Sequence, residues 1–311
     1  MDRFSLKVIK KDYCQWKMNG MIQFAKFRNN IREKRNQEAC TYDAQSYSIC
    51  SKKESIHMSL LKVEGLGKSY TADKQILKNI HFEIKAGELV SIIGPSGAGK
   101  STMLRCINRM VEFNEGKIMF NNHDVGSLNK KELRNLRANI GMVFQHYNLV
   151  PRLTVIENVL HGRFGYKTTL QGLLGRYTEE EKERAFYLLE KLGIHEHAYK
   201  RCDQLSGGQQ QRVGICRALI QEPKLILCDE PIASLDPNSS KVIMDLLKSI
   251  STEMGITCLV NLHQVDVAQH YSDRIIGLNK GEIVFTGTSH ELYDEQINKI
   301  YGSKTEDLIT A

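Results

Sequence analysis

The chain has 311 residues, of which 41% are hydrophobic and 25% charged, a composition that indicates a globular protein and excludes a disordered one. Its longest stretch without Asp, Glu, Lys or Arg covers 14 residues, 138–151, and is too short to cross a bilayer as a helix. The net charge of +7 is concentrated in residues 1–57, which hold 12 basic and six acidic residues, so the balanced remainder does not favour nucleic-acid binding.

Residues 1–57 form a basic extension with no sustained helical or strand periodicity. Charged residues occupy its start, MDRFSLKVIKK, where a signal peptide needs an apolar run, so we expect a chain that is not exported. The eight cysteines contain no C-x-x-C pair and are therefore expected to be reduced thiols. The extension could be an arm that binds a membrane surface or a partner. We favour a disordered or non-native segment, because the ordered pattern begins only at Met58.

From Met58 the chain alternates short apolar runs with helical patterns, which predicts one α/β domain over 58–302 and a C-terminal tail over 303–311. Early strands cluster and later strands alternate with helices, so we expect a parallel-sheet core with an antiparallel addition. Residues 146–205 show no strand pattern and are predicted to be an inserted helical subdomain. The predicted strands are 60–66, 81–84, 88–93, 117–120, 140–144, 224–228, 256–261, 274–278 and 282–285. The predicted helices are 100–110, 130–137, 155–161, 178–192, 206–220, 238–253, 264–271 and 289–295.

The first motif is the stretch SIIGPSGAGKST (91–102), which follows an apolar strand and precedes a helix. It matches the phosphate-loop pattern G-x-x-x-x-G-K-[ST], in which glycines let backbone N–H groups approach phosphate oxygens. Lys100 would reach the terminal phosphates, and the Ser101 hydroxyl would bind Mg²⁺. An ordinary glycine-rich turn is the alternative, but the flanking strand and helix favour a nucleotide site. The candidate nucleotide ligands are Gly94, Pro95, Ser96, Gly97, Ala98, Gly99, Lys100, Ser101 and Thr102.

The second motif is LILCDE (225–230), an apolar strand that ends in two carboxylates. Asp229 is predicted to hold Mg²⁺, directly or through water, and Glu230 to polarise an attacking water. Two adjacent acids suit this chemistry because metal binding and base catalysis are separate tasks. The alternative is a strand end with two solvated acids, and the phosphate loop upstream favours the catalytic interpretation.

The third motif is QLSGGQQQRVGICRAL (204–219), which predicts a helix capped by Ser206 with an apolar stripe on Val213, Cys216 and Ile220. The two glycines after the cap expose the first free N–H groups of the helix, so the helix tip is a candidate second anion site. The alternative is a capped helix that binds no ligand.

LSGGQ at 205–209 resembles the signature of the ATP-binding-cassette (ABC) ATPases, and the resemblance covers about 58–302. It implies a P-loop NTPase fold with a RecA-like parallel-sheet core, an antiparallel β subdomain and an inserted helical subdomain. The other motifs of the family follow in the expected order, which leaves little room for coincidence.

The resemblance also implies roles for four residues outside the three motifs. Tyr70 would stack on the adenine ring. Gln145 would touch the metal and the attacking water, and His263 would contact the γ-phosphate. Asp236, in the triplet SLD, would belong to a loop that crosses between subunits.

By the same resemblance, two copies of the chain would pair head to tail with ATP and Mg²⁺ between them. The signature helix tip of one copy would face the γ-phosphate held by Lys100 of the other. Hydrolysis would let the copies separate, so turnover would drive opening and closing. The residues implied to contact ATP across this interface are Ser206, Gly207, Gly208, Gln209 and Asp236.

Three classes of ABC protein could use such a cycle: transport ATPases, cassettes that act on DNA and cassettes that act on ribosomes. Only about 105 residues separate Lys100 from Leu205, with no heptad run that would suggest a DNA-type coiled coil. One cassette in the chain disfavours the ribosome type, and the lack of an apolar span disfavours a fused exporter. We therefore expect a peripheral importer ATPase at the cytoplasmic face of the membrane. Its partners would be multi-span permease subunits and, indirectly, an extracytoplasmic solute-binding protein, with no nucleic acid.

The transported solute follows from resemblance alone, because the ATPase subunit does not touch it. Residues 162–186, 229–237 and 261–268 resemble the ATPase subunits of phosphonate importers. The sequence therefore predicts an ATPase for phosphonate import. Phosphate and polar amino acids are the nearest alternatives.

Overall fold

The computed structural model describes residues 59–71, 74–173 and 175–302, so the predicted extension 1–57 and tail 303–311 lie outside the described residues. The strands are β1 (Ser59–Thr71), β2 (Lys74–Lys85), β3 (Leu89–Ile93), β4 (Glu115–Phe120), β5 (His123–Asp124), β6 (Ile140–Val143), β7 (Leu225–Asp229), β8 (Thr257–Asn261), β9 (Arg274–Asn279) and β10 (Glu282–Gly287). The α-helices are α2 (Lys100–Ile107), α3 (Lys130–Ala138), α4 (Val155–Leu160), α5 (Thr169–Leu173), α6 (Glu179–Lys191), α7 (Gly207–Leu219), α8 (Pro237–Met254), α9 (Val265–Tyr271) and α10 (Asp294–Tyr301). Short 3-10 helices are η3 (Val125–Ser127), η4 (His161–Tyr166), η5 (His195–His197), η6 (Cys202–Gln204) and η7 (Ser289–Glu291).

The larger sheet has the strand order β10-β9-β3-β8-β7-β6, in which all neighbours are parallel except the edge pair β10 and β9. Strands β3, β7 and β8 are buried at every residue, as continuous apolar runs require when both faces of a sheet are covered. Alternate side chains of β7 point to opposite faces, so Ile226 joins one hydrophobic core and Leu227 the other. Because the strands are parallel, their carboxyl ends meet at one edge of the sheet.

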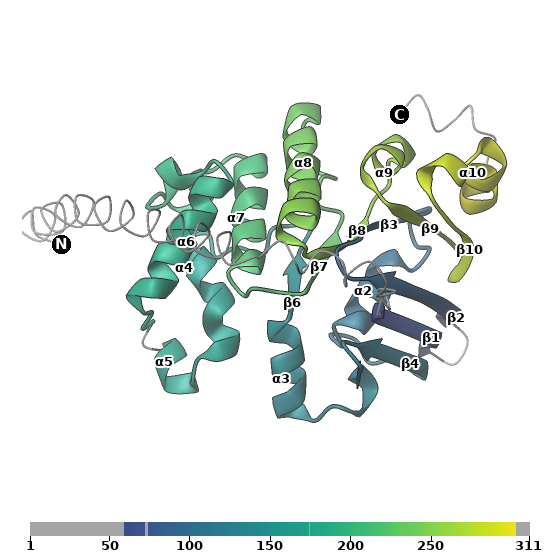
Figure 1. Ribbon diagram of the computed structural model, residues 1–311, viewed down its shortest axis with the longest axis horizontal. Coiled ribbons are helices and arrows are strands. Elements are labelled where there is room, and N and C mark those ends of the chain that lie inside the picture. Colours follow the sequence, from purple (N-terminus) through teal and green to yellow (C-terminus); the bar gives the residue numbers. More distant parts are fainter. Residues whose placement is uncertain (1–58, 72–73, 174, 303–311) are drawn as a thin grey trace, which may run out of the picture. The chain divides into compact units, whose positions relative to one another are not determined.

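The smaller sheet is antiparallel, with the order β2-β1-β4-β5. Its inward side chains, such as Leu61 and Ile80, share one core with helix α2 and with β3 and β7 of the larger sheet. The other face of the larger sheet packs against α7, α8, α9 and α10 (Figure 1). The phosphate loop and helix α2 therefore lie between the two sheets.

Residues 146–205 contain helices α4, α5 and α6 and several 3-10 turns, and the described part of this segment contributes no strand to either sheet. Figure 1 shows α4 and α6 beside α7, with α5 farther from it. The starts of α4 and α6 carry capping boxes, Thr154 with Glu157 and Thr178 with Glu181. Val159 of α4 and Leu188 of α6 are buried in the same core as the apolar side of α7. Whether the segment is an independent subdomain stays a prediction.

Most predicted elements agree with the structure to within a few residues, but one predicted strand is too short and one predicted helix is wrong. The predicted strand 81–84 is only the end of β2, which pairs with β1 back to Lys74 through several register shifts. The predicted helix 289–295 is a 3-10 turn over 289–291, and the true helix α10 starts at Asp294. Thr288 and Glu291 form a capping box there, a helix-start signal in the sequence that produces only one turn.

The five cysteines within the described residues are free thiols and are buried in the hydrophobic cores. Burial raises the pKa of the Cys106 and Cys202 thiols to about 11 and that of Cys258 to about 12. Burial also raises the pKa of Cys216 and Cys228. The structure thus agrees with reduced cysteines that serve as small apolar side chains.

Candidate nucleotide site

The loop between β3 and α2 can approach a ligand closely because its glycines adopt backbone angles that other residues rarely take. Gly94, Gly97 and Gly99 have φ of +151°, +80° and +109°. A Cβ atom on Gly94 would lie 2.0 Å from the carbonyl oxygen of Leu278 in the neighbouring strand β9. Gly99 is the N-cap of α2 and provides no side-chain cap, so the first N–H groups of the helix remain available to an anion.

Lys100 lies inside this loop, with only 4% of its surface exposed. Its Nζ atom donates hydrogen bonds to the carbonyl oxygens of Gly94, at 2.6 Å, and Pro95, at 3.2 Å. Burial lowers the pKa of Lys100, while the nearby Glu230 and Asp229 oppose that shift. A buried ammonium group whose hydrogen bonds go only to backbone carbonyl oxygens gains stabilisation from an anionic ligand.

Asp229 is the centre of a polar cluster at the carboxyl ends of β7 and β8. Its Oδ1 atom accepts hydrogen bonds from Ser101 Oγ, at 2.7 Å, and from Asn261 Nδ2, at 3.0 Å. Arg105 Nη2 lies 3.6 Å from the other carboxylate oxygen. The amide oxygen of Asn261 is buried without a hydrogen-bond partner among the described residues. Hydroxyl, carboxylate and amide oxygens are ligands of the type that Mg²⁺ prefers, so the donor set fits that ion.

Glu230 follows directly and has a left-handed backbone, with φ of +52°. This conformation is uncommon for a residue with a side chain, and such residues concentrate at functional sites. Its Oε1 atom lies 2.7 Å from His263 Nε2, and since a carboxylate only accepts, the histidine nitrogen carries the proton. The Tyr301 hydroxyl donates to the carbonyl oxygen of His263 at 3.0 Å, which fixes the loop after β8 against α10.

The signature stretch begins helix α7 with a capping box. Gln209 N donates to Ser206 Oγ at 3.4 Å, and Ser206 N donates to Gln209 Oε1 at 3.0 Å. The side-chain Nε2 atom of Gln209 donates in turn to His197 Nε2 at 2.9 Å. A Cβ atom on Gly208 would lie 2.8 Å from Ser239 Oγ in the first turn of α8. The tips of α7 and α8 therefore pack against each other.

Asp236 caps α8 and belongs to the same tip. Its carboxylate accepts a hydrogen bond from Ser239 N at 3.0 Å, and hydrogen bonding to Ser239 lowers the pKa of Asp236. Asp236 is exposed. The capped tips thus present a surface to solvent in one copy of the chain.

Comparisons with known proteins fit this arrangement. The ABC transporter family model matches residues 77–233, just over half of the chain. The chain belongs to the ABC transporter family. ABC transporter ATP-binding proteins bind and hydrolyse ATP, so this chain is an ATPase.

Two relatives and one solved structure extend the comparison. A phosphonates import ATP-binding protein of Oceanobacillus iheyensis is 72% identical over 253 residues, covering 81% of this chain and 100% of the relative. A protein of the same description from Lactiplantibacillus plantarum is 53% identical, covering 78% and 94%. A solved dimeric ATP-binding cassette in a post-hydrolysis state, bound to ADP and Pi, is 38% identical with a TM-score of 0.66, covering 75% of this chain and 100% of that one. The expected fold class, a P-loop ABC cassette, is confirmed.

The ABC fold brings most of the predicted site residues together, but not all of them. Lys100, Ser101 and Asp229 lie in one cluster, and Glu230 contacts His263 beside it. Gln145 is half-buried after β6, and no hydrogen bond or ion pair joins it to that cluster within the described residues. Tyr70 is 57% exposed, and its ring lies 5.0 Å from Lys68 Nζ. The roles predicted for these two residues stay predictions.

Sequence patterns did not indicate several residues that support the ABC site. Asn261 ends the apolar strand TCLVN, and only the parallel order of β7 and β8 puts it beside Asp229. His197 contacts Gln209 of the signature motif from another element, and Arg217, inside that motif, contacts the turn after Gln145. A polar residue at the end of a buried strand is the one signal that could have identified Asn261.

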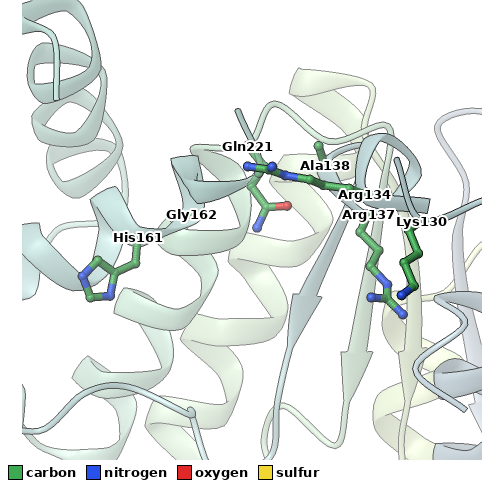
Figure 2. A pocket seen from close by; sticks show the side chains of 8 residues that line it. Lys130, Arg134, Arg137, Ala138, His161, Gly162 and Gln221 are labelled. Carbon is green, nitrogen blue, oxygen red and sulfur yellow. The ribbon is translucent and has the colours of Figure 1, made fainter. Parts of the chain in front are cut away.

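A separate cavity of about 290 Å³ lies where α3, η4 and Gln221, two residues after α7, meet. Arg134 and Arg137 donate to backbone carbonyl oxygens, Arg134 to those of Phe164 and Lys167 and Arg137 to those of Asn108 and Arg109. In Figure 2, Arg134 extends toward Gln221 while Arg137 lies beside Lys130. None of these cations pairs with a carboxylate in the described chain. The cavity is lined by Lys130, Arg134, Arg137, Ala138, His161, Gly162, Gly165 and Gln221.

No helix in the described ranges has both the length and the apolar character that a bilayer crossing needs.

Proposed function

We propose that this chain is the ATP-hydrolysing subunit of a phosphonate importer. The observation that carries the proposal is the 72% identity to a phosphonates import ATP-binding protein over that relative's whole length. The nucleotide site supports it, because the groups that an ATPase needs lie at one edge of the parallel sheet.

In the proposed mechanism, the backbone N–H groups of the loop 94–99 and the tip of α2 bind the phosphates of ATP. Lys100 turns from its carbonyl partners toward the terminal phosphates, whose negative charge stabilises the buried ammonium group. Tyr70 covers the adenine ring, and its exposed ring surface supports that role.

Ser101 and Asp229 would hold Mg²⁺, together with Gln145. The Ser101 and Asp229 oxygen atoms lie 2.7 Å apart, and all three side chains offer oxygen ligands of the type that Mg²⁺ prefers. When bound, the ion neutralises charge on the phosphate oxygens that Lys100 does not reach. Asn261 orients the Asp229 carboxylate by donating to Oδ1.

Glu230 acts as the base that orients and deprotonates the attacking water, and His263 contacts the γ-phosphate. The hydrogen bond between them orients the Glu230 carboxylate before substrate binds. The strained backbone at Glu230 fixes the direction in which the carboxylate leaves the strand.

A second copy completes the site. The tips of α7 and α8, with Ser206, Gly207, Gly208, Gln209 and Asp236, would face the nucleotide of the partner. The dimeric cassette among the solved relatives supports this pairing. ATP then joins the copies, and loss of the γ-phosphate releases them.

Permease subunits are the proposed membrane partners, and they would bind the helices of 146–205 and the cationic cavity beside α3. The cavity suits an acidic cytosolic segment, because its cations lack carboxylate partners in the described chain. An extracytoplasmic solute-binding protein would deliver the phosphonate to the permease.

Growth with a phosphonate as the sole phosphorus source tests the proposal. A strain without the gene should not grow, the wild-type gene should restore growth, and Glu230→Gln should not. Inorganic phosphate as the phosphorus source is the control, on which all three strains should grow equally. Normal growth of the deletion strain on phosphonates, or a defect confined to phosphate or amino-acid uptake, would overturn it.

A further inference from the structure

Arg217, in the third turn of α7, carries a charge that the described residues do not neutralise with a carboxylate. Burial lowers the pKa of its guanidinium group. Its Nη2 atom donates to the carbonyl oxygen of Tyr147 at 2.8 Å, and its Nη1 atom donates to that of Asn148 at 2.5 Å. Holding a half-buried cation with backbone partners alone is costly, so the contact needs a physical reason.

The two carbonyl groups belong to a tight turn that begins two residues after Gln145. Tyr147 and Asn148 both have left-handed backbones, with φ of +57° and +48°. Two such residues in succession are strained when neither is glycine, and they persist only where the surroundings fix them. The fork of Arg217 supplies two bonds that fix them.

The same turn also touches the tip of α7. A Cβ atom on Gly207 would lie 2.8 Å from the Tyr147 hydroxyl oxygen, and one on Gly214 would lie 3.9 Å from the Tyr147 carbonyl oxygen. Positions 207, 214 and 217 share one face of the helix, because they are seven and three residues apart. The turn therefore lies along α7 from the signature tip to Arg217.

We propose that Arg217 is a positioning residue that locks the turn after Gln145 to the signature helix. With the lock in place, Gln145 and Ser206 change position as one body. The inference rests on the proposed function, in which Gln145 touches the metal of its own copy and Ser206 faces the nucleotide of the partner. Arg217 would then couple the two nucleotide sites of the dimer.

Kinetics of the full-length chain test the coupling with Arg217→Gln, Arg217→Lys, Gln145→Ala and the double variant Arg217→Gln with Gln145→Ala. We expect Arg217→Gln to lower kcat roughly tenfold, the scale of one charge-assisted hydrogen bond, with the KM for ATP changed less than about twofold. Arg217→Lys, which keeps the charge but not the fork, should fall between Arg217→Gln and wild type. The double variant should be no slower than Gln145→Ala, because both changes act through the same residue.

Amide hydrogen exchange tests the lock without relying on the role of Gln145. In the wild type, added ATP should slow exchange in residues 145–149 and in 206–210 together. In the Arg217 variants the protection should remain in one segment and be lost from the other, because the mechanical link is broken. Arg217→Lys keeps this measurement open if Arg217→Gln fails to fold.

Arg109→Gln is the matched control, because the Arg109 guanidinium also donates to two carbonyl oxygens, those of Val125 and Leu128. It should lower the melting temperature and leave kcat of the folded protein unchanged. Wild-type kcat in Arg217→Gln, or joint protection of both segments in the Arg217 variants, would overturn the inference. Full activity of Gln145→Ala would instead refute the proposed role of Gln145, and the exchange result would still decide the lock.

Discussion

At the scale of single residues, the site combines one strained backbone with one buried cation. Glu230 has a left-handed φ of +52°, and Lys100 is held by two carbonyl oxygens of its own loop. Both arrangements cost free energy in the folded chain, as expected for residues with the roles proposed for them in ATP binding and hydrolysis. The two residues have different proposed roles: Lys100 binds the phosphates of ATP, and Glu230 acts as the base in its hydrolysis.

Glu230→Gln should bind ATP but hydrolyse it about 10²- to 10³-fold more slowly, because an amide cannot accept the proton of the attacking water. The variant should also accumulate as an ATP-bound dimer, which size-exclusion chromatography would detect. Lys100→Ala is the contrasting variant and should lose most nucleotide binding. Near-normal turnover in Glu230→Gln would remove Glu230 from the role of base.

The sequence was sufficient to predict residues that belong to contiguous motifs, and insufficient for residues that reach a motif from elsewhere. Lys100 and Ser101 follow from one short pattern, in which spacing alone fixes their place at a helix start. Asn261 and His197 gain their contacts with Asp229 and Gln209 only through strand order and packing. Such contacts depend on tertiary structure, which local patterns do not encode.

At the scale of elements, helix starts were predictable because five helical segments begin with a complete capping box. The predicted helix 289–295 follows one of these boxes, at Thr288, where the capped turn does not continue as an α-helix. The apolar residues that α10 buries, Ile297 and Ile300, lie beyond that turn. The length of β2 was also missed, since pairing with β1, and not its own composition, sets where it starts.

The start of α6 offers a test of stability. Glu181 accepts hydrogen bonds from Lys167 Nζ at 2.5 Å, Arg163 Nε at 3.3 Å and Thr178 N at 2.9 Å. Burial alone would raise the pKa of Glu181, but these bonds outweigh it and the net pKa is lowered from 4.5. Glu181→Gln should therefore lower the free energy of unfolding by about 2 kcal/mol at pH 7, measured by denaturant unfolding.

The pH dependence of this difference has a definite sign. A carboxylate whose pKa is lowered by folding stabilises the protein fully above its unfolded pKa, and that stabilisation is lost as the pH falls through the folded pKa. The gap between wild type and Glu181→Gln should thus shrink below about pH 4. Glu179→Gln, at an exposed position of the same helix, should have the free energy of unfolding of the wild type both at pH 7 and below about pH 4. A gap that is constant or wider in acid would contradict the assignment.

At the scale of the whole molecule, the parallel sheet explains how motifs more than 100 residues apart in the chain form one site. The carboxyl ends of β3, β7 and β8 meet at one edge, so the phosphate loop, Asp229 and His263 lie together. Both hydrophobic cores of the described structure are built from residues after Met58. The ATP site does not set which solute is transported, because no described residue of that site needs to touch the solute.

Removal of residues 1–57 should leave ATP hydrolysis within about twofold of the full chain, because every predicted motif lies beyond them. The measurement is kcat of the chain that starts at Met58. A deeper truncation, through Gly65, is the control; it should abolish soluble expression, because it removes the buried Leu61 and Val63 of β1. Loss of activity or solubility in the shorter deletion would show that the extension belongs to the fold.

The reactivity of the buried cysteines can report local opening of the folded protein. Cys106, Cys202, Cys216, Cys228 and Cys258 lie in five different elements, α2, η6, α7, β7 and β8. The thiolate is the nucleophile that attacks an alkylating reagent, and a raised pKa keeps the thiolate scarce while the cores are closed. Mass spectrometry of alkylated peptides would therefore map, without engineered cysteines, which part of the cassette opens first when nucleotide is withdrawn.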